Sequence, residues 1–374
     1  MKVLAVSTWY PSAQALTSGV FVQRDCRTLA KDHDVTVVHL ARGRAAVADP
    51  VADPESEQDG RLRVLRLPFD PRRPVAMVRS LRRVRALLRD ADVVHTMAFS
   101  SIIPLAVGRR RRPWVHTEHW SGVSAPWSLS PGLRLVMRPL RRIIAFPDVA
   151  VAVCEYLAAP VRRRRSRPTV VVPCIVERRT PPTPRRNDPD VLALIAVGGL
   201  VPGKDPQTAV RTVAELRRRG VACHLTWLGD GPLKDEIRAL AAECGVADAV
   251  DLAGAVPADE VATRLNAADM LLLPTRHENF CVSAAEALLA GRPVVLGGHG
   301  GQTEYVDDSV GQLVDFQTPE AYADAVETVQ KRLACLPAEH FSARVAERFG
   351  EATVRAGYRN VYAQAVAVHE KRGL

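Results

Sequence analysis

Short apolar runs rich in β-branched residues alternate with longer amphipathic stretches along most of the chain. The runs cover residues 3–7, 35–40, 62–67, 93–96, 114–117, 149–153, 170–172, 192–197, 224–228, 250–252, 270–273, 294–296 and 312–314. Apolar strands separated by helices are typical of a parallel sheet that is covered by helices on both faces. Because 374 residues exceed one ordinary core, the two series of runs predict an α/β chain with two Rossmann-like, doubly wound domains.

A proline-rich stretch separates the two series. Residues 180–189 read TPPTPRRNDP, which continues neither a helix nor a central strand. We therefore expect an N-terminal domain over 1–180, a linker over 181–190 and a C-terminal domain over 191–349. We also expect a C-terminal helix, over about 350–374, to complete the first domain. Open parallel sheets bind ligands at the carboxyl ends of their strands, so two such domains facing each other are expected to form a cleft.

The chain has a formal net charge of +10, with arginine clusters at 109–112 and 162–165. A solvated arginine-rich surface is the simplest interpretation, and peripheral attraction of the basic N-terminal domain to an anionic membrane is the alternative. Residues 131–146 mix arginines with large apolar groups, for which core packing with solvated arginines is the more economical account. No nucleic-acid-binding motif accompanies the charge, so we expect no nucleic-acid partner.

The sequence contains no apolar stretch that would span a bilayer, since the longest uncharged one, 93–108, includes polar residues and a proline. The apolar run at the N-terminus is too short for a signal peptide. Seven cysteines form no C-x-x-C pair, so we expect neither a disulfide framework nor a metal site. These features predict a cytoplasmic protein, with peripheral contact at the inner face of the membrane as the alternative.

Two glycine-containing segments follow predicted strands. Residues 197–205 read VGGLVPGKD, in which the glycines would let the backbone approach a phosphate that Lys204 could neutralise. Residues 297–304 read GGHGGQTE and would expose their backbone to a ligand in the same way. Each segment alone also fits a plain turn, and that alternative stays open.

An acidic segment follows the strand predicted at 270–273. Glu278 lies in a loop before a helix over about 281–290, and Glu286 lies within that helix. The free N–H groups of a helix N-terminus suit an anion, and carboxylates accept hydrogen bonds from sugar or ribose hydroxyls. The competing interpretation is a capping glutamate followed by a solvated one.

Together these segments resemble the family 4 glycosyltransferases, a large retaining family with the GT-B fold. In the second domain the resemblance rests on G-x-L-x-x-x-K from Gly198, G-D-G-P at 229–232, E-x7-E from Glu278 to Glu286, P-V-V at 293–295 and G-G-x-x-E from Gly300 to Glu304. In the first domain it rests on S-G-V-F-V at 18–22, P-W-V-H-T-E-H ending at His119 and V-V-P-C-I-V-E at 171–177. The family's N-terminal domain binds the acceptor, and its C-terminal domain binds the nucleotide sugar.

The resemblance implies roles for the matched residues. Lys204 would pair with the donor diphosphate, Glu278 would contact the transferred sugar, and His119 would line the reaction centre, so these three are the catalytic candidates. The other donor-binding candidates are Gly19, Gly198, Gly199, Arg276, Phe280, Cys281, Val282 and Glu286, the last on the ribose hydroxyls. The acceptor candidates, for which core packing is an equal alternative, are Trp9, Tyr10 and Trp120. For His95 and His116 we expect packing.

The resemblance also implies the chemistry. Retaining enzymes of this type are thought to use front-face attack, in which the leaving diphosphate helps to take the acceptor proton and neither a metal nor another cofactor is required. A UDP-sugar is the preferred donor on family frequency alone. The acceptor classes left open are a glycan, a lipid-linked sugar, a polyol and a natural product.

Four positions depart from the family pattern. Gly199 stands where the family has an arginine that faces the diphosphate, and Arg276 or, less plausibly, Arg292 could substitute for it. Cys281 replaces a glycine at the helix N-terminus, where its side chain could narrow the phosphate site. Cys174 and Ile175 replace the usual Asn-Gly. The alternatives to a transferase are a nucleotide-sugar epimerase or glycoside phosphorylase on the same fold, and a non-catalytic partner with a degraded donor site.

Overall fold

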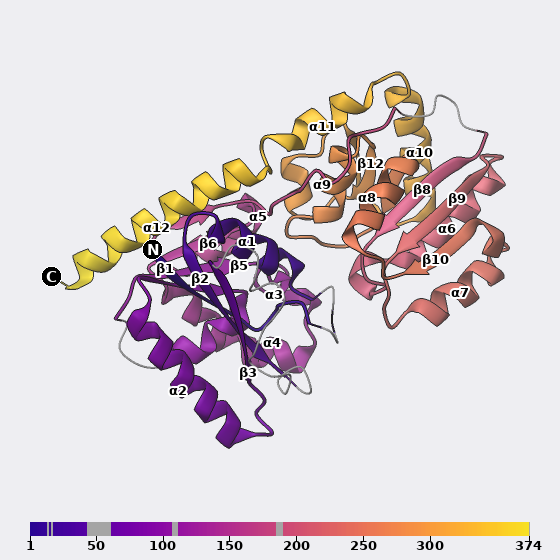
Figure 1. Ribbon diagram of the computed structural model, residues 1–374. Coiled ribbons are helices and arrows are strands. Elements are labelled where there is room, and N and C mark those ends of the chain that lie inside the picture. The colour runs from indigo at the N-terminus through magenta and orange to yellow at the C-terminus, as the bar shows by residue number, and fades with distance from the viewer. Residues whose placement is uncertain (13–14, 16–17, 43–60, 107–110, 185–189, 374) are drawn as a thin grey trace. The chain divides into compact units, whose positions relative to one another are not determined.

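The computed structural model describes residues 1–12, 15, 18–42, 61–106, 111–184 and 190–373. These residues form two compact units (Figure 1), one of Met1–Ile175 with Glu351–Leu374 and one of Val176–Gly350. The chain therefore leaves the first unit once and returns to it through its C-terminal segment. Residues 109 and 110 of the first arginine cluster and 185–189 of the predicted linker lie outside the described residues, so the linker boundary stays a prediction.

The described residues of the first unit form a seven-stranded sheet in the order β3-β2-β1-β4-β5-β6-β7, with every neighbouring pair parallel. Its strands are β1 (Lys2–Ser7), β2 (Asp34–Ala41), β3 (Leu62–Pro68), β4 (Val93–Met97), β5 (Trp114–Glu118), β6 (Val149–Ala152) and β7 (Thr169–Val171). Each apolar run predicted in this part of the chain is a strand. The order reverses between β1 and β4, where ligands bind in folds of this kind.

Helices cover this sheet and complete its core. They are α1 (Val20–Ala30), α2 (Pro74–Asp90), α3 (Ser121–Ser124), α4 (Pro131–Leu140), α5 (Glu155–Arg162) and α12 (Glu351–Gly373). Short 3₁₀ turns occur at Phe99–Ser101, Ile103–Leu105, Pro126–Ser128 and Arg141–Ala145. Helix α12, yellow in Figure 1, contacts β5 and β6, and its Tyr358 and Tyr362 are fully buried in the same core as Val22 and Val115. The far end of the chain is thus part of the first unit's core.

The second unit has the same architecture. Its described residues form a six-stranded parallel sheet in the order β10-β9-β8-β11-β12-β13. The strands are β8 (Leu192–Val197), β9 (Cys223–Leu228), β10 (Val250–Gly254), β11 (Met270–Leu273), β12 (Val294–Gly297) and β13 (Gly311–Val314). The helices are α6 (Pro206–Arg218), α7 (Lys234–Glu243), α8 (Ala258–Ala267), α9 (Val282–Leu289), α10 (Pro319–Leu333) and α11 (Ala338–Ala346), with 3₁₀ turns at Pro202–Lys204, Ala247–Ala249 and Gly301–Glu304.

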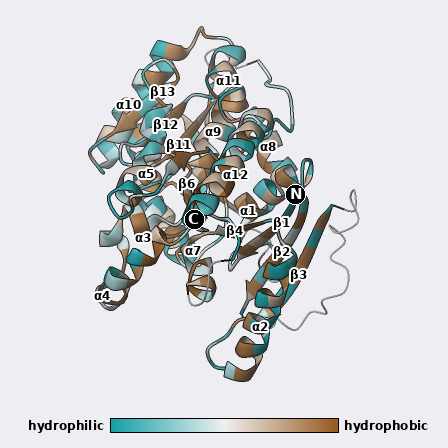
Figure 2. Ribbon diagram, turned by 90° about the vertical axis from the view of Figure 1, so that its left-hand side faces the viewer, coloured by the Kyte–Doolittle hydropathy of each residue, from teal (hydrophilic) through white to brown (hydrophobic). Residues whose placement is uncertain are grey.

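The hydropathy of the two units explains why these segments form a covered parallel sheet. Figure 2 shows the strands mainly in the hydrophobic colour, whereas the helices mix both colours. Strands β11 and β12 are wholly buried, as expected for parallel strands that have helices on both faces. The predicted fold class of two Rossmann-like α/β units is therefore confirmed.

The C-terminal helical pattern is interrupted in the structure. Helix α11 ends at Ala346, and α12, the helix expected over about 350–374, begins at Glu351. Gly350 lies at the break, where an added Cβ would come within 2.7 Å of the Ala346 carbonyl oxygen. The break is also where the chain passes from one unit to the other. Among the described residues, no helix has both the length and the apolar character needed to cross a bilayer.

Candidate active site

Lys204 and Glu278 meet in the second unit. Lys204 ends the 3₁₀ turn after β8, and Glu278 lies in the loop between β11 and α9. The Lys204 ammonium donates a hydrogen bond to Glu278 Oε1, and Thr275 Oγ1 donates to the same oxygen at 2.9 Å. Burial alone would lower the pKa of Lys204, but the nearby Glu278 carboxylate outweighs it and raises that pKa. The two candidate residues therefore form a partly buried pair in which the ammonium stays charged.

The loop of Glu278 is held by the glycine-rich segment after β12. The Glu278 N–H donates to His299 O at 3.3 Å, and the Gly301 N–H donates to Glu278 O at 3.1 Å. Gly300 has a φ of 136°, and an added Cβ there would lie 2.1 Å from the Glu278 carbonyl oxygen. Only glycine fits such a position. The three segments that the sequence singled out are thus brought together at the carboxyl ends of β8, β11 and β12.

Helix α9 begins beside this pair with an unusual backbone. Cys281, the residue before the helix, has a φ of 62°, a left-handed conformation that favours glycine. Its thiol is buried, and burial followed by the Glu278 charge raises the pKa of Cys281 to about 12. The Phe280 ring packs against Tyr305 and Phe349, with centroids 5.5 and 4.8 Å away. Phe280 and Cys281 therefore shape the helix start, at which Val282 is the first residue.

The two arginines proposed to replace the missing family arginine differ in position. The Arg276 side chain is 64% exposed, and its Nε donates a hydrogen bond to Asp205 Oδ2 at 3.0 Å. The backbone N–H of Arg276 donates to Gly203 O at 2.9 Å. Arg276 thus lies beside the Lys204 turn. Arg292 is buried beyond the other end of α9 and donates to Thr183 Oγ1 at 2.6 Å. As a substitute on the diphosphate, Arg292 was a wrong expectation, because its guanidinium is held in the interior.

The two glycines after β8 have different steric requirements. Gly198 has a φ of 150°, and an added Cβ would come within 3.1 Å of Lys204 Cε. Gly199 has no positive φ, and its Cβ would meet only ordinary contacts, the nearest at 3.4 Å from Asp230 O. The backbone at 199 would therefore accept a side chain, and the loss of the family arginine is not a steric necessity.

Glu286 lies on α9 near a charged cluster that the sequence did not reveal. Arg179 donates to Asp259 Oδ1 at 2.6 Å and to Glu177 Oε2 at 2.7 Å. Burial opposes the charged form of Arg179, but the charges of Asp259, Glu177 and Glu286 together raise its pKa. Arg179 therefore stands close to the carboxylate expected to bind ribose.

The first unit supplies a glycine at the start of α1. Gly19 precedes the helix with a φ of 73°, and an added Cβ would lie 2.4 Å from the Trp9 carbonyl carbon. Two factors therefore exclude a side chain at this position: the left-handed backbone conformation and the steric clash with the Trp9 backbone. The helix N-terminus leaves backbone N–H groups without intrahelical partners, which suits a close-lying anion.

His119 follows β5 and faces α1. Its ring lies 4.3 Å from the Phe21 ring, and its Nε2 lies 3.8 Å from Asp25 Oδ2. The Tyr358 hydroxyl of α12 donates to the same Asp25 oxygen at 2.8 Å. Burial, followed by the charge of His116, lowers the pKa of His119 to about 3, and burial raises the pKa of Asp25 to about 7. His119 is therefore a neutral imidazole near pH 7.

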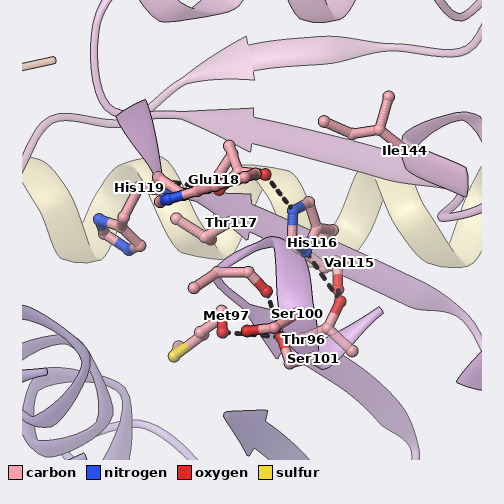
Figure 3. Close-up of polar contacts among 12 residues, drawn as sticks. Thr96, Met97, Ser100, Ser101, Val115, His116, Thr117, Glu118, His119 and Ile144 are labelled. Atoms are coloured by element: carbon pink, nitrogen blue, oxygen red, sulfur yellow. Dashed lines mark hydrogen bonds and ion pairs between the residues drawn. The ribbon is translucent and has the colours of Figure 1, made fainter. Parts of the chain in front are cut away.

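A buried polar network fixes the backbone around His119. Glu118 Oε1 accepts hydrogen bonds from the His119 and Trp120 N–H groups at 2.9 and 2.8 Å. Figure 3 shows the His116 ring between Glu118 and Thr96, with 3.3 Å from Nε2 to Glu118 Oε2 and 3.0 Å from Nδ1 to Thr96 Oγ1. Because these side chains are fully buried, the turn that presents His119 is held from inside the fold.

The aromatic acceptor candidates divide between surface and core. Trp9 is 37% exposed and lies edge-on to Phe21 at 5.9 Å. Tyr10 is fully buried in the core, and Trp120 packs against Phe99 at 5.8 Å. Core packing, the alternative that the sequence left open, thus describes Tyr10, whereas Trp9 keeps an exposed face. His95 is also buried, with Tyr362 and Thr117 as its hydrogen-bond partners.

Comparison with known proteins identifies the family. The profile described as "Glycosyl transferases group 1" matches residues 181–333, and the one described as "Glycosyltransferase Family 4" matches residues 18–179. A GDP-mannose-dependent alpha-(1-6)-phosphatidylinositol monomannoside mannosyltransferase of Mycobacterium tuberculosis is 30% identical over 270 residues, which cover 65% of this chain and 68% of the relative. The chain belongs to the family 4 glycosyltransferases.

Two further similarities agree with this assignment. A D-inositol 3-phosphate glycosyltransferase of Xylanimonas cellulosilytica is 33% identical to the enzyme, and the match covers 73% of this chain and 72% of the relative. A sucrose-phosphate synthase structure from Thermosynechococcus elongatus superposes with a TM-score of 0.81 over 98% of this chain and all of the other, at 19% identity. The first similarity supports a glycosyltransferase, and the second supports the GT-B fold.

Proposed function

We propose that this glycosyltransferase moves a sugar from a nucleoside-diphosphate sugar to a hydroxyl group of an acceptor, with retention of the anomeric configuration. The observation that carries the proposal is the Lys204–Glu278 pair beside the N-terminus of α9. A cation and free N–H groups at one edge suit a diphosphate, and an adjacent carboxylate suits sugar hydroxyls. The proposal assigns the second unit to the donor and the first unit to the acceptor.

Sugar transfer places its largest charge change on the leaving diphosphate. The bond from the anomeric carbon to the diphosphate oxygen breaks, and the acceptor oxygen forms a bond to that carbon on the same face. The acceptor proton passes to the departing diphosphate, so this route uses neither a metal nor another cofactor. Lys204 would move its hydrogen bond from Glu278 toward the developing negative charge, and fixed cations of this kind supply much of the rate enhancement.

His119 would contribute without carrying charge. Its lowered pKa leaves the imidazole neutral near pH 7, so it would hydrogen bond to the transferred sugar and not compete for the diphosphate. The close approach of backbone at Gly19, where a Cβ is excluded, would complete the first unit's contribution. Both assignments apply the family pattern to residues whose positions are fixed by close contacts in the first unit.

The nucleotide and the acceptor are the finer part of the proposal. A UDP-sugar is the preferred donor, and GDP-mannose is the alternative, because the name of the mycobacterial relative specifies GDP-mannose. The relatives' names also give two acceptor types to test, phosphatidylinositol monomannoside and inositol 3-phosphate. We further propose a cytoplasmic location with peripheral membrane contact through the basic first unit. The free state of all seven cysteines supports a reducing compartment.

The test is incubation of the enzyme with UDP-glucose or GDP-mannose, with and without each acceptor, followed by proton NMR of the product. We expect nucleoside diphosphate release that requires acceptor and an anomeric proton with the configuration of the donor. Inverted product would contradict retention. A changed sugar without acceptor would instead indicate an epimerase, release that requires phosphate would indicate a phosphorylase, and no turnover with any pair would favour a non-catalytic partner.

A further inference from the structure

A helix of the first unit exposes most of its apolar side chains. Helix α4 buries only Met137 among its ten residues, while Leu133, Leu135 and Val136 are 45%, 72% and 57% exposed. Core packing was the expected account of residues 131–146, and it holds for Met137 and Ile144 but is wrong for these three exposed side chains. Trp127, 61% exposed, lies in the preceding turn.

The turn and the helix are joined into one surface. Arg134 of α4 donates hydrogen bonds to Trp127 O at 2.9 Å and to Leu129 O at 3.2 Å. This link holds the tryptophan turn against the helix, so its exposed side chain and those of α4 belong to one structural element. We call this surface, formed by Trp127, Leu133, Leu135 and Val136, the α4 surface. Figure 2 shows both hydropathy colours on α4.

The acidic and basic residues of the segment that carries the α4 surface are of one sign. Residues 119–147 contain no Asp or Glu, but they contain Arg134, Arg138, Arg141 and Arg142. Arg138 and Arg142 are exposed, and Arg134 donates to two backbone carbonyls, which leave its charge uncompensated. Exposed apolar side chains interleaved with cations are the pattern of a helix that lies in the interface of an anionic bilayer.

Arg141 adds an independent observation. Its side chain is nine-tenths buried, and its Nε has no hydrogen-bond partner among the described residues. Burial and then the charges of Arg164 and Arg134 lower the pKa of Arg141, so two other cations act on this buried guanidinium. Arg164 donates to the Pro160 carbonyl at 2.6 Å, which neutralises no charge. Burying a cation is costly unless an anion compensates it, and an incoming phosphate would relieve that cost.

We propose that the α4 surface docks this enzyme on an anionic phospholipid bilayer, with the apolar side chains in the interface and lipid phosphates on the surrounding arginines. The surface lies in the connection that follows β5, directly after the strand that ends before His119. Docking would therefore hold this edge of the first unit at the lipid headgroups. The inference deepens the membrane contact proposed above and does not require any particular donor or acceptor.

The test is co-sedimentation with vesicles of phosphatidylglycerol and phosphatidylcholine, compared with vesicles of phosphatidylcholine alone. We expect the wild-type enzyme to bind the anionic vesicles, with weaker binding as salt screens the charges. Leu135→Glu with Val136→Glu should lower partitioning at least about tenfold, because charge replaces apolar insertion. Arg138→Gln with Arg142→Gln should lower binding to anionic vesicles and leave the weak binding to neutral ones unchanged.

The matched control is Val75→Glu with Val78→Glu, which makes the same charge change at two exposed valines of α2. Equal loss of binding in this control would overturn the assignment to α4, as would wild-type enzyme that stays in solution with anionic vesicles. Two other ligands of the α4 surface would give different results. Thermal stabilisation by inorganic phosphate without vesicle binding would indicate a soluble anion, and wild-type dimers that L135E/V136E abolishes would indicate a second copy. Either result contradicts membrane docking. Since no donor or acceptor is present, failure here would leave the proposed transfer reaction untouched.

Discussion

At the scale of single residues, Gly199 is the departure from the family with the clearest physical consequence. Its backbone would accept a side chain without clash, and the exposed Arg276 stands beside the neighbouring Lys204 turn. The absence of an arginine at 199 therefore removes a cation without any steric demand for glycine. If Arg276 supplies the missing charge, the two positions are interchangeable in part.

We predict that Gly199→Arg lowers the donor KM and that Arg276→Ala raises it, each by about tenfold, the size expected for one charge-assisted hydrogen bond. In the Gly199→Arg background, Arg276→Ala should matter less, because one cation compensates for the other. Initial rates against donor concentration would measure this, with the exposed Arg211→Ala on α6 as the control. An undiminished Arg276→Ala effect in the double variant would show that the two arginines are not equivalent.

Single residues also mark where sequence reasoning stops. Lys204, Glu278 and the glycines could be named because their spacing follows a pattern whose backbone geometry the structure explains, as at Gly300 and Gly19. The sequence did not point to Asp25, Glu118 or Arg179, because their partners come from other segments of the chain or from buried neighbours. One sequence signal was available for Asp25. It is an aspartate on the helix face that also carries the buried apolar residues Val22, Cys26 and Leu29. The roles of all these residues in transfer stay predictions.

At the scale of secondary structure elements, Asp25 links α1 to α12. It accepts a hydrogen bond from Tyr358 and lies beside His119, and it has almost no exposed surface. Near the end of the same helix, Asp32 binds Arg355 and Arg359 of α12, which lower its pKa. Helix α12 is therefore docked on the side that carries His119 by one buried and one partly buried carboxylate.

The raised pKa of Asp25 predicts a pH-dependent stability. Its value is 3.8 in the unfolded chain and about 7 in the native enzyme, so the native state retains a proton that the unfolded state releases. This contribution is complete below about pH 4 and is lost as the pH rises through about 7. Asn at this position cannot titrate. We therefore expect Asp25→Asn to gain stability relative to wild type between pH 5 and pH 8.

Thermal unfolding of both proteins at the two pH values would measure this difference, with Asp34→Asn at an exposed site as the control. A difference in Tm that is the same at pH 5 and pH 8 would contradict the raised pKa. If the expected change also appeared in the control, it would reflect net charge and not the buried position.

At the scale of the whole molecule, the alternation of strands and helices determined most of what could be predicted. Every predicted apolar run is a strand, because parallel strands that are covered on both faces are continuously apolar. The burial of residues 131–146 could not be predicted. Hydrophobic periodicity does not distinguish an apolar helix face that packs in the core from one that is exposed to solvent.

The central claim is that the second unit grips a nucleoside diphosphate through Lys204. It is tested most directly by thermal unfolding of wild type, Lys204→Ala and Lys331→Ala with UDP or GDP, Lys331 being an exposed lysine on α10. Ligand at 100 times its Kd adds about 2.7 kcal/mol of stability. We predict that one nucleotide raises the Tm of wild type and Lys331→Ala by several degrees and leaves Lys204→Ala unchanged. An equal rise in all three proteins would contradict the claim.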